Sequence, residues 1–142
     1  MRVYETHSGR LLGEYRRGAD PAAIYQIVFN RDATKIAVAS DKGTVHIFNL
    51  ETPSGQPVLY EDAGRNRQSS LAFMKDLLPK YFASEWSFAQ FHLRDGRCAL
   101  HFDEEEGNAI WAATFDGYLY RFVFDVVRGG EAVQMLCKPL FD

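Results

Sequence analysis

The sequence predicts an all-β protein, a partial β-propeller of about three blades, and three observations support this fold class. The chain contains an internal repeat, the repeated units read as short strands, and tight Asp–Gly turns separate those strands. Residues 2–9 align with residues 46–55, and the offset of roughly 44 residues is about the length of one four-stranded blade. Residues 114–122 match residues 40–48 as a further copy.

The first predicted strands lie at the start of the chain. Strand-like residues 2–6 follow Met1 directly, and residues 11–15 form an extended run that leads into Arg16 and Arg17. Because a domain rarely begins in mid-strand, we expect the chain to be a fragment or the product of a truncated gene model. Successive side chains of a strand leave it on opposite faces, so the two arginines point into two different spaces. Each guanidinium fits a phosphate bidentately, although a solvated pair is the ordinary interpretation of such a motif.

The remaining strands follow from alternation and turn residues. We expect them at residues 24–29, 35–40, 43–50, 97–102, 108–114 and 117–124, with 132–136 as a last strand. The chain then divides into three units: residues 1–18 as the end of a truncated blade, 19–96 as a blade with an insertion at about 51–88, and 97–142 as the final blade.

The insertion is longer than a normal blade requires. Its first half is rich in proline, glycine, serine and charge, which is typical of a loop. In its second half, Ser69 or Ser70 can cap a short helix that Pro79 ends. The apolar face of this helix would hold Leu71, Met74, Leu77 and Leu78. Its neighbours Lys75, Lys80, Tyr81 and Trp86 tolerate a membrane interface, so the pattern fits either membrane insertion or an ordinary packed cap.

Composition argues against several function classes. The net charge of −3 gives no general positive field for nucleic acid, so anion binding must be local. The four histidines and two cysteines lack metal-ligand spacing. There is no glycine-rich phosphate loop, no nucleophile elbow and no stretch apolar enough to span a bilayer. We therefore expect no catalytic residue, metal site, cofactor, nucleic-acid partner or transmembrane segment.

Several motifs appear in a fixed order along the chain. They are YRRG at residues 15–18, SDKGTVHIF at 40–48, NRQSSL at 66–71, LPKYF at 78–82 and EWSFA at 85–89. Together they resemble the PROPPIN family, which are seven-bladed WD-type propellers that bind phosphoinositides. The resemblance covers nearly the whole chain and corresponds to the last blades of the ring. The family usually has Leu or Phe where this chain has Tyr15.

The resemblance implies a non-enzymatic protein that reads phosphatidylinositol 3-phosphate or 3,5-bisphosphate in autophagy or endosomal traffic. It implies a cytoplasmic protein, peripheral on autophagosomal or on endosomal and vacuolar membranes, with autophagy scaffold proteins as partners. In the family the paired arginines divide between two rim pockets, which assigns Arg16 to the first pocket and Arg17 to the second. The second pocket would also use Ser40, Thr44 and His46, with Arg65 or Arg67 at the far end of the loop.

The resemblance also implies that residues 69–88 are a hydrophobic loop that inserts into membranes. Its inserting side chains would be Leu71, Phe73, Met74, Leu77, Leu78, Tyr81, Phe82 and Trp86. For the second pocket, we expect protonation of His46 to strengthen anion binding as the pH falls. The main alternative is a WD-like protein-interaction scaffold without lipid binding, in which Arg16 and Arg17 form ordinary rim salt bridges.

Overall fold

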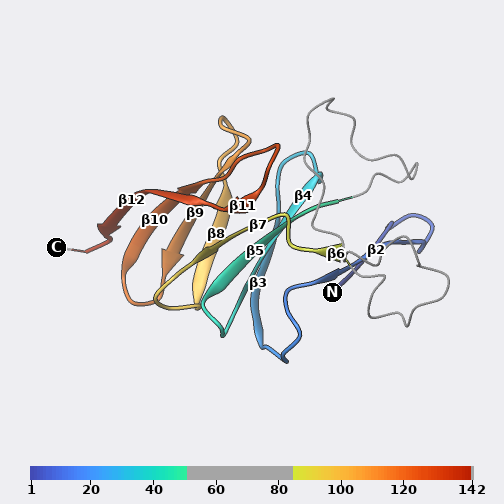
Figure 1. The fold of residues 1–142 in the computed structure, drawn as a ribbon, viewed down its shortest axis with the longest axis horizontal. Coiled ribbons are helices and arrows are strands. Elements are labelled where there is room, and N and C mark those ends of the chain that lie inside the picture. Colours follow the sequence, from blue (N-terminus) through green and yellow to red (C-terminus); the bar gives the residue numbers. More distant parts are fainter. Residues whose placement is uncertain (51–84, 142) are drawn as a thin grey trace.

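The computed structural model describes residues 1–50 and 85–141, and in this part of the chain it contains twelve β-strands and no helix. The strands form three sheets that lie side by side, from the N-terminal sheet to the C-terminal one (Figure 1). The described residues therefore confirm the predicted all-β class.

Each sheet is built mainly from strands that are consecutive in the chain. The first has the order β1-β2-β6, with β1 at Arg2–Tyr4, β2 at Leu11–Arg16 and β6 at Glu85–Trp86. The middle sheet has the order β11-β7-β5-β4-β3, with β3 at Ile24–Phe29, β4 at Lys35–Ser40, β5 at Thr44–Asn49, β7 at Ala89–His92 and β11 at Gly130–Glu131. The third has the order β12-β10-β9-β8, with β8 at Cys98–Phe102, β9 at Ala109–Thr114, β10 at Tyr118–Val123 and β12 at Val133–Pro139.

The predicted strand positions agree closely with these bounds. Strands β3 and β4 match at both ends, and β5, β8, β9 and β10 match to within one residue at each end. The prediction lacked β6, β7 and β11, which are short and pair with strands that are distant in sequence. The predicted insertion includes residues 85–88, and the structure corrects this end of it. Trp86 lies in β6, and Phe88, 1% exposed, is a core residue.

The middle sheet has an apolar core on each face because its central strands alternate between the two sides. Along β4, Ala37 and Ala39 belong to the large cluster shared with the third sheet. Ile36 and Val38 belong to the smaller cluster shared with the first sheet. A strand covered on both faces reads as a continuous apolar run, as β4 does.

Aromatic pairs join the neighbouring sheets. Phe91 of β7 stacks on Phe122 of β10 with ring centroids 4.0 Å apart. On the other face, the ring of Tyr15 in β2 meets the ring of Phe48 in β5 edge-on at 5.5 Å. The edge-on geometry of Tyr15 and Phe48 is a favourable one for aromatic rings, so this contact stabilises the interface beyond the apolar area that it buries.

Backbone pairing also crosses between sheets at their outer edges. Strand β6 pairs in parallel with β2, and the chain then continues directly into β7 of the middle sheet. Strand β11, which follows the third sheet's β10, pairs in parallel with β7. The segment 85–92 therefore touches the first and middle sheets and fixes their relative position.

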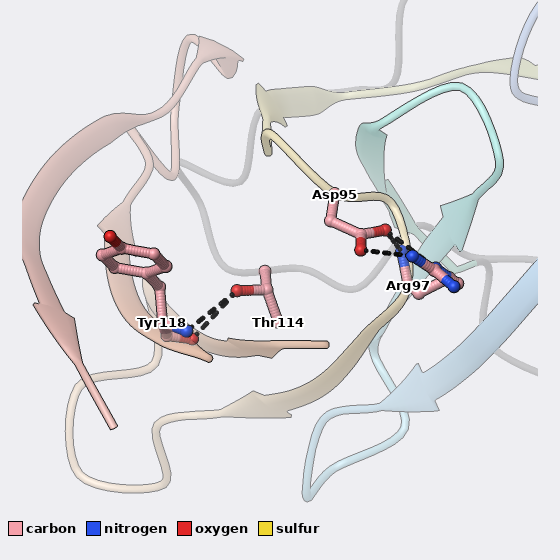
Figure 2. A network of polar contacts seen from close by, with 4 residues as sticks. All are labelled: Asp95, Arg97, Thr114 and Tyr118. Carbon is pink, nitrogen blue, oxygen red and sulfur yellow. Dashed lines mark hydrogen bonds and ion pairs between the residues drawn. The ribbon is translucent and has the colours of Figure 1, made fainter. Parts of the chain in front are cut away.

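Polar contacts close the turns at one end of the sheets (Figure 2). In the loop between β7 and β8, Nη2 of Arg97 donates to Oδ2 of Asp95 at 2.9 Å. In the turn between β9 and β10, the Thr114 hydroxyl donates to the Tyr118 carbonyl at 3.1 Å and accepts from its N–H at 3.3 Å. Gly96 lies so close to the middle sheet that a Cβ there would meet the Ser40 carbonyl oxygen at 2.1 Å. Position 96, in the loop after β7, therefore has no room for any residue but glycine.

Strand β3 carries an apolar side that is only partly covered. Tyr25, Ile27 and Phe29 alternate along the strand and are each nearly half exposed, at 48%, 47% and 49%. The part of the chain that the structure describes holds no helix long and apolar enough to cross a membrane.

Candidate functional site

The two arginines of the YRRG motif lie on opposite sides of β2, as strand alternation predicts. Tyr15 faces the middle sheet and is 1% exposed against Phe48. Arg16, the next residue, lies on the opposite side, where its Nη2 is 3.5 Å from Oε1 of Glu14. The same carboxylate also pairs with Arg2 at 2.9 Å. Arg16 thus sits in an acid-paired setting on the outer side of the first sheet.

Arg17 follows β2 and returns to the side of Tyr15. Its Nη2 donates to the main-chain carbonyl of Asp20 at 2.8 Å. The loop that contains this carbonyl is tied to the β4–β5 turn, because the Ala23 N–H donates to Oδ1 of Asp41 at 3.1 Å. The Asp41 N–H donates back to the Ala23 carbonyl at 3.0 Å. These contacts hold the Arg17 loop against the start of β5.

His46 lies in the middle of β5, on the side that faces β2. It is opposite Val38 of β4 and Gln90 of β7, and it is 6% exposed. Its ring stacks on that of Phe48 with centroids 6.4 Å apart. Its Nδ1 is 3.0 Å from Oγ of Ser87, in the segment between β6 and β7. The imidazole is therefore held by packing and by one hydrogen bond.

The surroundings of His46 keep it neutral. Burial disfavours the charged ring, and the positive charge of Arg17 and the neighbouring His92 act in the same direction. Together they lower the pKa of His46 from 6.5 to about 4. That protonation of His46 strengthens anion binding as the pH falls stays a prediction, and the lowered pKa places this change near pH 4.

Thr44 and His92 extend the same face toward the solvent. They form a cross-strand pair between β5 and β7, and Oγ1 of Thr44 is 3.1 Å from Nδ1 of His92. Thr44 and His46 share one face, as alternation predicts. His92 was missed by the sequence analysis because it lies 48 residues from Thr44, beyond the insertion. Ser87 and Gln90 were missed for the same reason.

Ser40 stands apart from the other candidates of the second pocket. It is 0% exposed, and its Oγ accepts the Lys42 N–H at 3.4 Å within the β4–β5 turn. The structure therefore gives Ser40 a role in shaping the turn from which Thr44 emerges. Its role as a direct ligand stays a prediction.

The other predicted site residues lie mostly outside the described part of the chain. These are Arg65, Arg67, Leu71, Phe73, Met74, Leu77, Leu78, Tyr81 and Phe82, together with the helix expected near residues 71–78. Trp86 is described: it is half-buried in β6 and pairs with Arg16 of β2.

The grouped side chains suit a small oxyanion. Arg17 brings a positive charge and the neutral ring of His46 can donate a hydrogen bond, while the Thr44 hydroxyl and the His92 ring, 3.1 Å apart, add further hydrogen-bonding groups. Within residues 1–50 and 85–141, no group of three or more His, Cys, Asp or Glu side chains could hold a metal ion. The side chains of Arg17, Thr44 and His46 are of the kinds that can bind an anion.

Comparisons with known proteins agree with this architecture. No family model matches the chain. The chain is 34% identical over 143 residues to autophagy-related protein 18e of Arabidopsis thaliana, which covers 99% of this chain and 36% of that protein. Hsv2 of Kluyveromyces lactis, solved with a complete loop 6CD, superposes with a TM-score of 0.67 at 23% identity, covering 98% of this chain and 41% of that chain. A complex of KlAtg21 with the coiled coil of AgAtg16 gives a TM-score of 0.65 at 21% identity, covering 98% and 33%.

These likenesses show the fold of a partial β-propeller. The chain spans about a third of the length of the curated relative it matches. The order and pairing of the strands therefore have a counterpart along almost the entire chain.

Proposed function

Because this chain belongs to the PROPPIN family of β-propellers, we propose that it contributes to the reading of phosphatidylinositol 3-phosphate or 3,5-bisphosphate on membranes that take part in autophagy or endosomal traffic. The observation that carries the proposal is that Arg17 lies close enough to His46 to lower its pKa, while Thr44 and His92 form a cross-strand pair on the face of β5 that also holds His46. The proposed action is binding without catalysis.

The division between the arginines supports this proposal. Arg17 hydrogen-bonds a neutral carbonyl, so its charge is not cancelled there by a carboxylate. A phosphate that replaced or joined this contact would form charge-assisted bonds, each worth roughly 1.5–3 kcal/mol. Arg16 has Glu14 beside it, so an anion at Arg16 would meet a competing negative charge. We therefore assign the larger part of headgroup binding in this chain to Arg17.

Vesicle flotation tests this function. The 142-residue chain is mixed with vesicles containing phosphatidylinositol, phosphatidylinositol 3-phosphate, phosphatidylinositol 4-phosphate or phosphatidylinositol 3,5-bisphosphate at equal mole fraction. We expect binding to the two 3-phosphorylated lipids to exceed binding to phosphatidylinositol by about tenfold or more. The 4-phosphate matches the charge of the 3-phosphate, so equal binding to the two would show nonspecific attraction. Binding to none of the phosphorylated lipids would leave the scaffold function as the better description.

Membrane insertion is a second part of the proposal and concerns residues outside the described part of the chain. We propose that Leu77, Leu78 and Phe82 enter the bilayer, since apolar burial and the nearby Lys75 and Lys80 both favour membrane binding. Replacing the three apolar residues by Asp should abolish flotation with phosphatidylinositol 3-phosphate. If flotation is unchanged, the segment is a packed cap and no membrane anchor.

Autophagy scaffold proteins remain the proposed protein partners. Two similar proteins support this proposal: an autophagy-related protein, and a structural neighbour that was solved in complex with a coiled coil. A coiled-coil peptide that binds the chain in the absence of vesicles would support this part of the proposal. Binding only in the presence of vesicles would instead point to an indirect association through the lipid.

A further inference from the structure

We propose that Ser87 is a positioning residue that keeps His46 in the tautomer with its proton on Nε2, so that His46 meets an anionic headgroup as a neutral hydrogen-bond donor. The identity of the ligand in this inference rests on the proposed function. The tautomer itself does not, because it is a property of the protein without ligand.

The backbone on both sides of Ser87 is held by hydrogen-bonded pairing. The next residue, Phe88, is 1% exposed, and its N–H donates to the Ile47 carbonyl of β5 at 2.8 Å. The preceding residue, Trp86 of β6, is paired with Arg16 of β2. Ser87 therefore lies between two fixed residues, and its hydroxyl reaches Nδ1 of His46 at 3.0 Å. The ring and the hydroxyl are held together by backbone pairing that neither side chain supplies.

The chemistry of the imidazole decides which form of His46 can bind an anion. A neutral histidine has one ring nitrogen that donates and one that accepts. Among the described residues, Nδ1 of His46 has the Ser87 hydroxyl as its partner, and Nε2 has none. A serine hydroxyl can donate to an unprotonated Nδ1, which leaves the proton on Nε2. A phosphate oxygen only accepts, so Nε2–H is the form that can bind it.

The groups around the ring of His46 favour its neutral form. Arg17 approaches from the end of β2, and His92 approaches from β7. Directly opposite His46, β4 presents the apolar Val38, and β7 presents Gln90, whose amide donates to Glu131 of β11 at 3.3 Å. The groups facing the ring are thus cationic, neutral or apolar. They disfavour an imidazolium, and the low pKa of His46 agrees with this.

The inference assigns different tasks to the two basic groups of the site. Arg17 supplies the charge, and His46 supplies a directed neutral donor whose orientation depends on Ser87. A side chain without a hydroxyl at position 87 could not hydrogen-bond Nδ1 of His46, so neither tautomer of the ring would be favoured. A second hydroxyl-bearing side chain would preserve it.

Nitrogen NMR of the histidine side chains tests the tautomer directly. The 142-residue chain is labelled with nitrogen-15 in histidine, and the His46 signals are identified by their loss in His46→Gln. At pH 7 we expect the wild-type chain to show His46 with a protonated Nε2 and an unprotonated Nδ1. In Ser87→Ala we expect a mixture of tautomers or the opposite one, and in Ser87→Thr the wild-type pattern. A wild-type ring protonated on Nδ1, or an unchanged pattern in Ser87→Ala, would overturn the inference.

Lipid binding supplies the second measurement. We expect Ser87→Ala to weaken binding to vesicles with phosphatidylinositol 3-phosphate about three- to tenfold, since one neutral hydrogen bond loses its orientation. Ser87→Thr should bind as the wild type does. If the wild type binds no phosphoinositide while its tautomer depends on Ser87, the proposed function fails and the positioning role stands. If the lipid binds and Ser87→Ala binds equally well, the positioning role fails and the function stands.

Discussion

The two sides of strand β2 place neighbouring arginines in opposite electrostatic settings. On the outer side, Arg16 lies beside Glu14, which also pairs with Arg2. On the inner side, Arg17 follows the buried Tyr15, donates to a main-chain carbonyl and lowers the pKa of His46. The difference teaches that two arginines adjacent in the sequence can lie in separate sites, one on each side of the strand. A substitution at either position should therefore report on only one side of the strand.

The largest expected effect concerns the packing that holds the inner side in place. Tyr15→Ala removes a ring that is 1% exposed and packs on Phe48. We expect the free energy of unfolding to fall by about 3–5 kcal/mol, as for other large aromatic truncations in a core. Urea unfolding followed by circular dichroism measures it. The control is Tyr4→Ala, at a residue 51% exposed, which should change the same quantity by less than about 1 kcal/mol.

We expect a comparable loss in the free energy of unfolding at acid pH, and it arises from His46 on the inner side of β2. The pKa of His46 is about 4 in the folded chain, below its ordinary value of 6.5. Between these values the unfolded chain takes up a proton that the folded chain does not, so stability falls as the pH falls from 6.5 to 4. A shift of this size corresponds to about 3 kcal/mol.

Unfolding of the wild type and of His46→Gln at pH 7 and at pH 4 measures this contribution. The wild type should lose more stability than the variant by about that amount. His101→Gln, at an exposed position of β8, is the matched control and should behave as the wild type. Equal pH dependence in the wild type and in His46→Gln would show that the histidine is not kept neutral by the fold.

The comparison also shows what a sequence can and cannot predict. Period-two alternation was enough to place Arg16 and Arg17 on opposite sides and to put Thr44 and His46 on one face. The β4–β5 hairpin was predictable because its Asp–Lys–Gly turn and its strands are local signals. These features depend only on residues close in the chain.

The partners of His46 could not be predicted in the same way. Ser87 lies just before β7 and His92 lies in β7, both far from β5 in the sequence, and no local pattern predicts their contacts with β5. The low pKa of His46 also depends on burial and on Arg17, which only the packed sheets bring close. The full burial of Ser40 could not be predicted either, because it depends on neighbouring strands and on the loop after β7 that cover the end of β4.

Arg17→Ala tests the functional side of the comparison. We expect it to weaken binding to vesicles with phosphatidylinositol 3-phosphate by roughly ten- to a hundredfold, because one charge-assisted contact is lost. Arg16→Ala should have little effect in this chain. Arg31→Ala, a highly exposed arginine near Glu104, controls for the loss of one positive charge. Equal losses from Arg16→Ala and Arg17→Ala would contradict the division between the two sides of β2.

The smallest expected effect on vesicle binding comes from Glu14→Gln, which tests whether Arg16 on the outer side of β2 contacts the lipid. Glu14→Gln removes the negative charge beside Arg16 while keeping the size of the side chain. If Arg16 contributes no headgroup contact in this chain, releasing it from Glu14 should change vesicle binding by less than about threefold, the range of a partly exposed ion pair. Flotation at low and at physiological salt separates a general charge effect, which salt screens, from a specific contact. A larger gain in affinity, kept at physiological salt and lost in Glu14→Gln with Arg16→Ala, would show that the outer side also binds lipid.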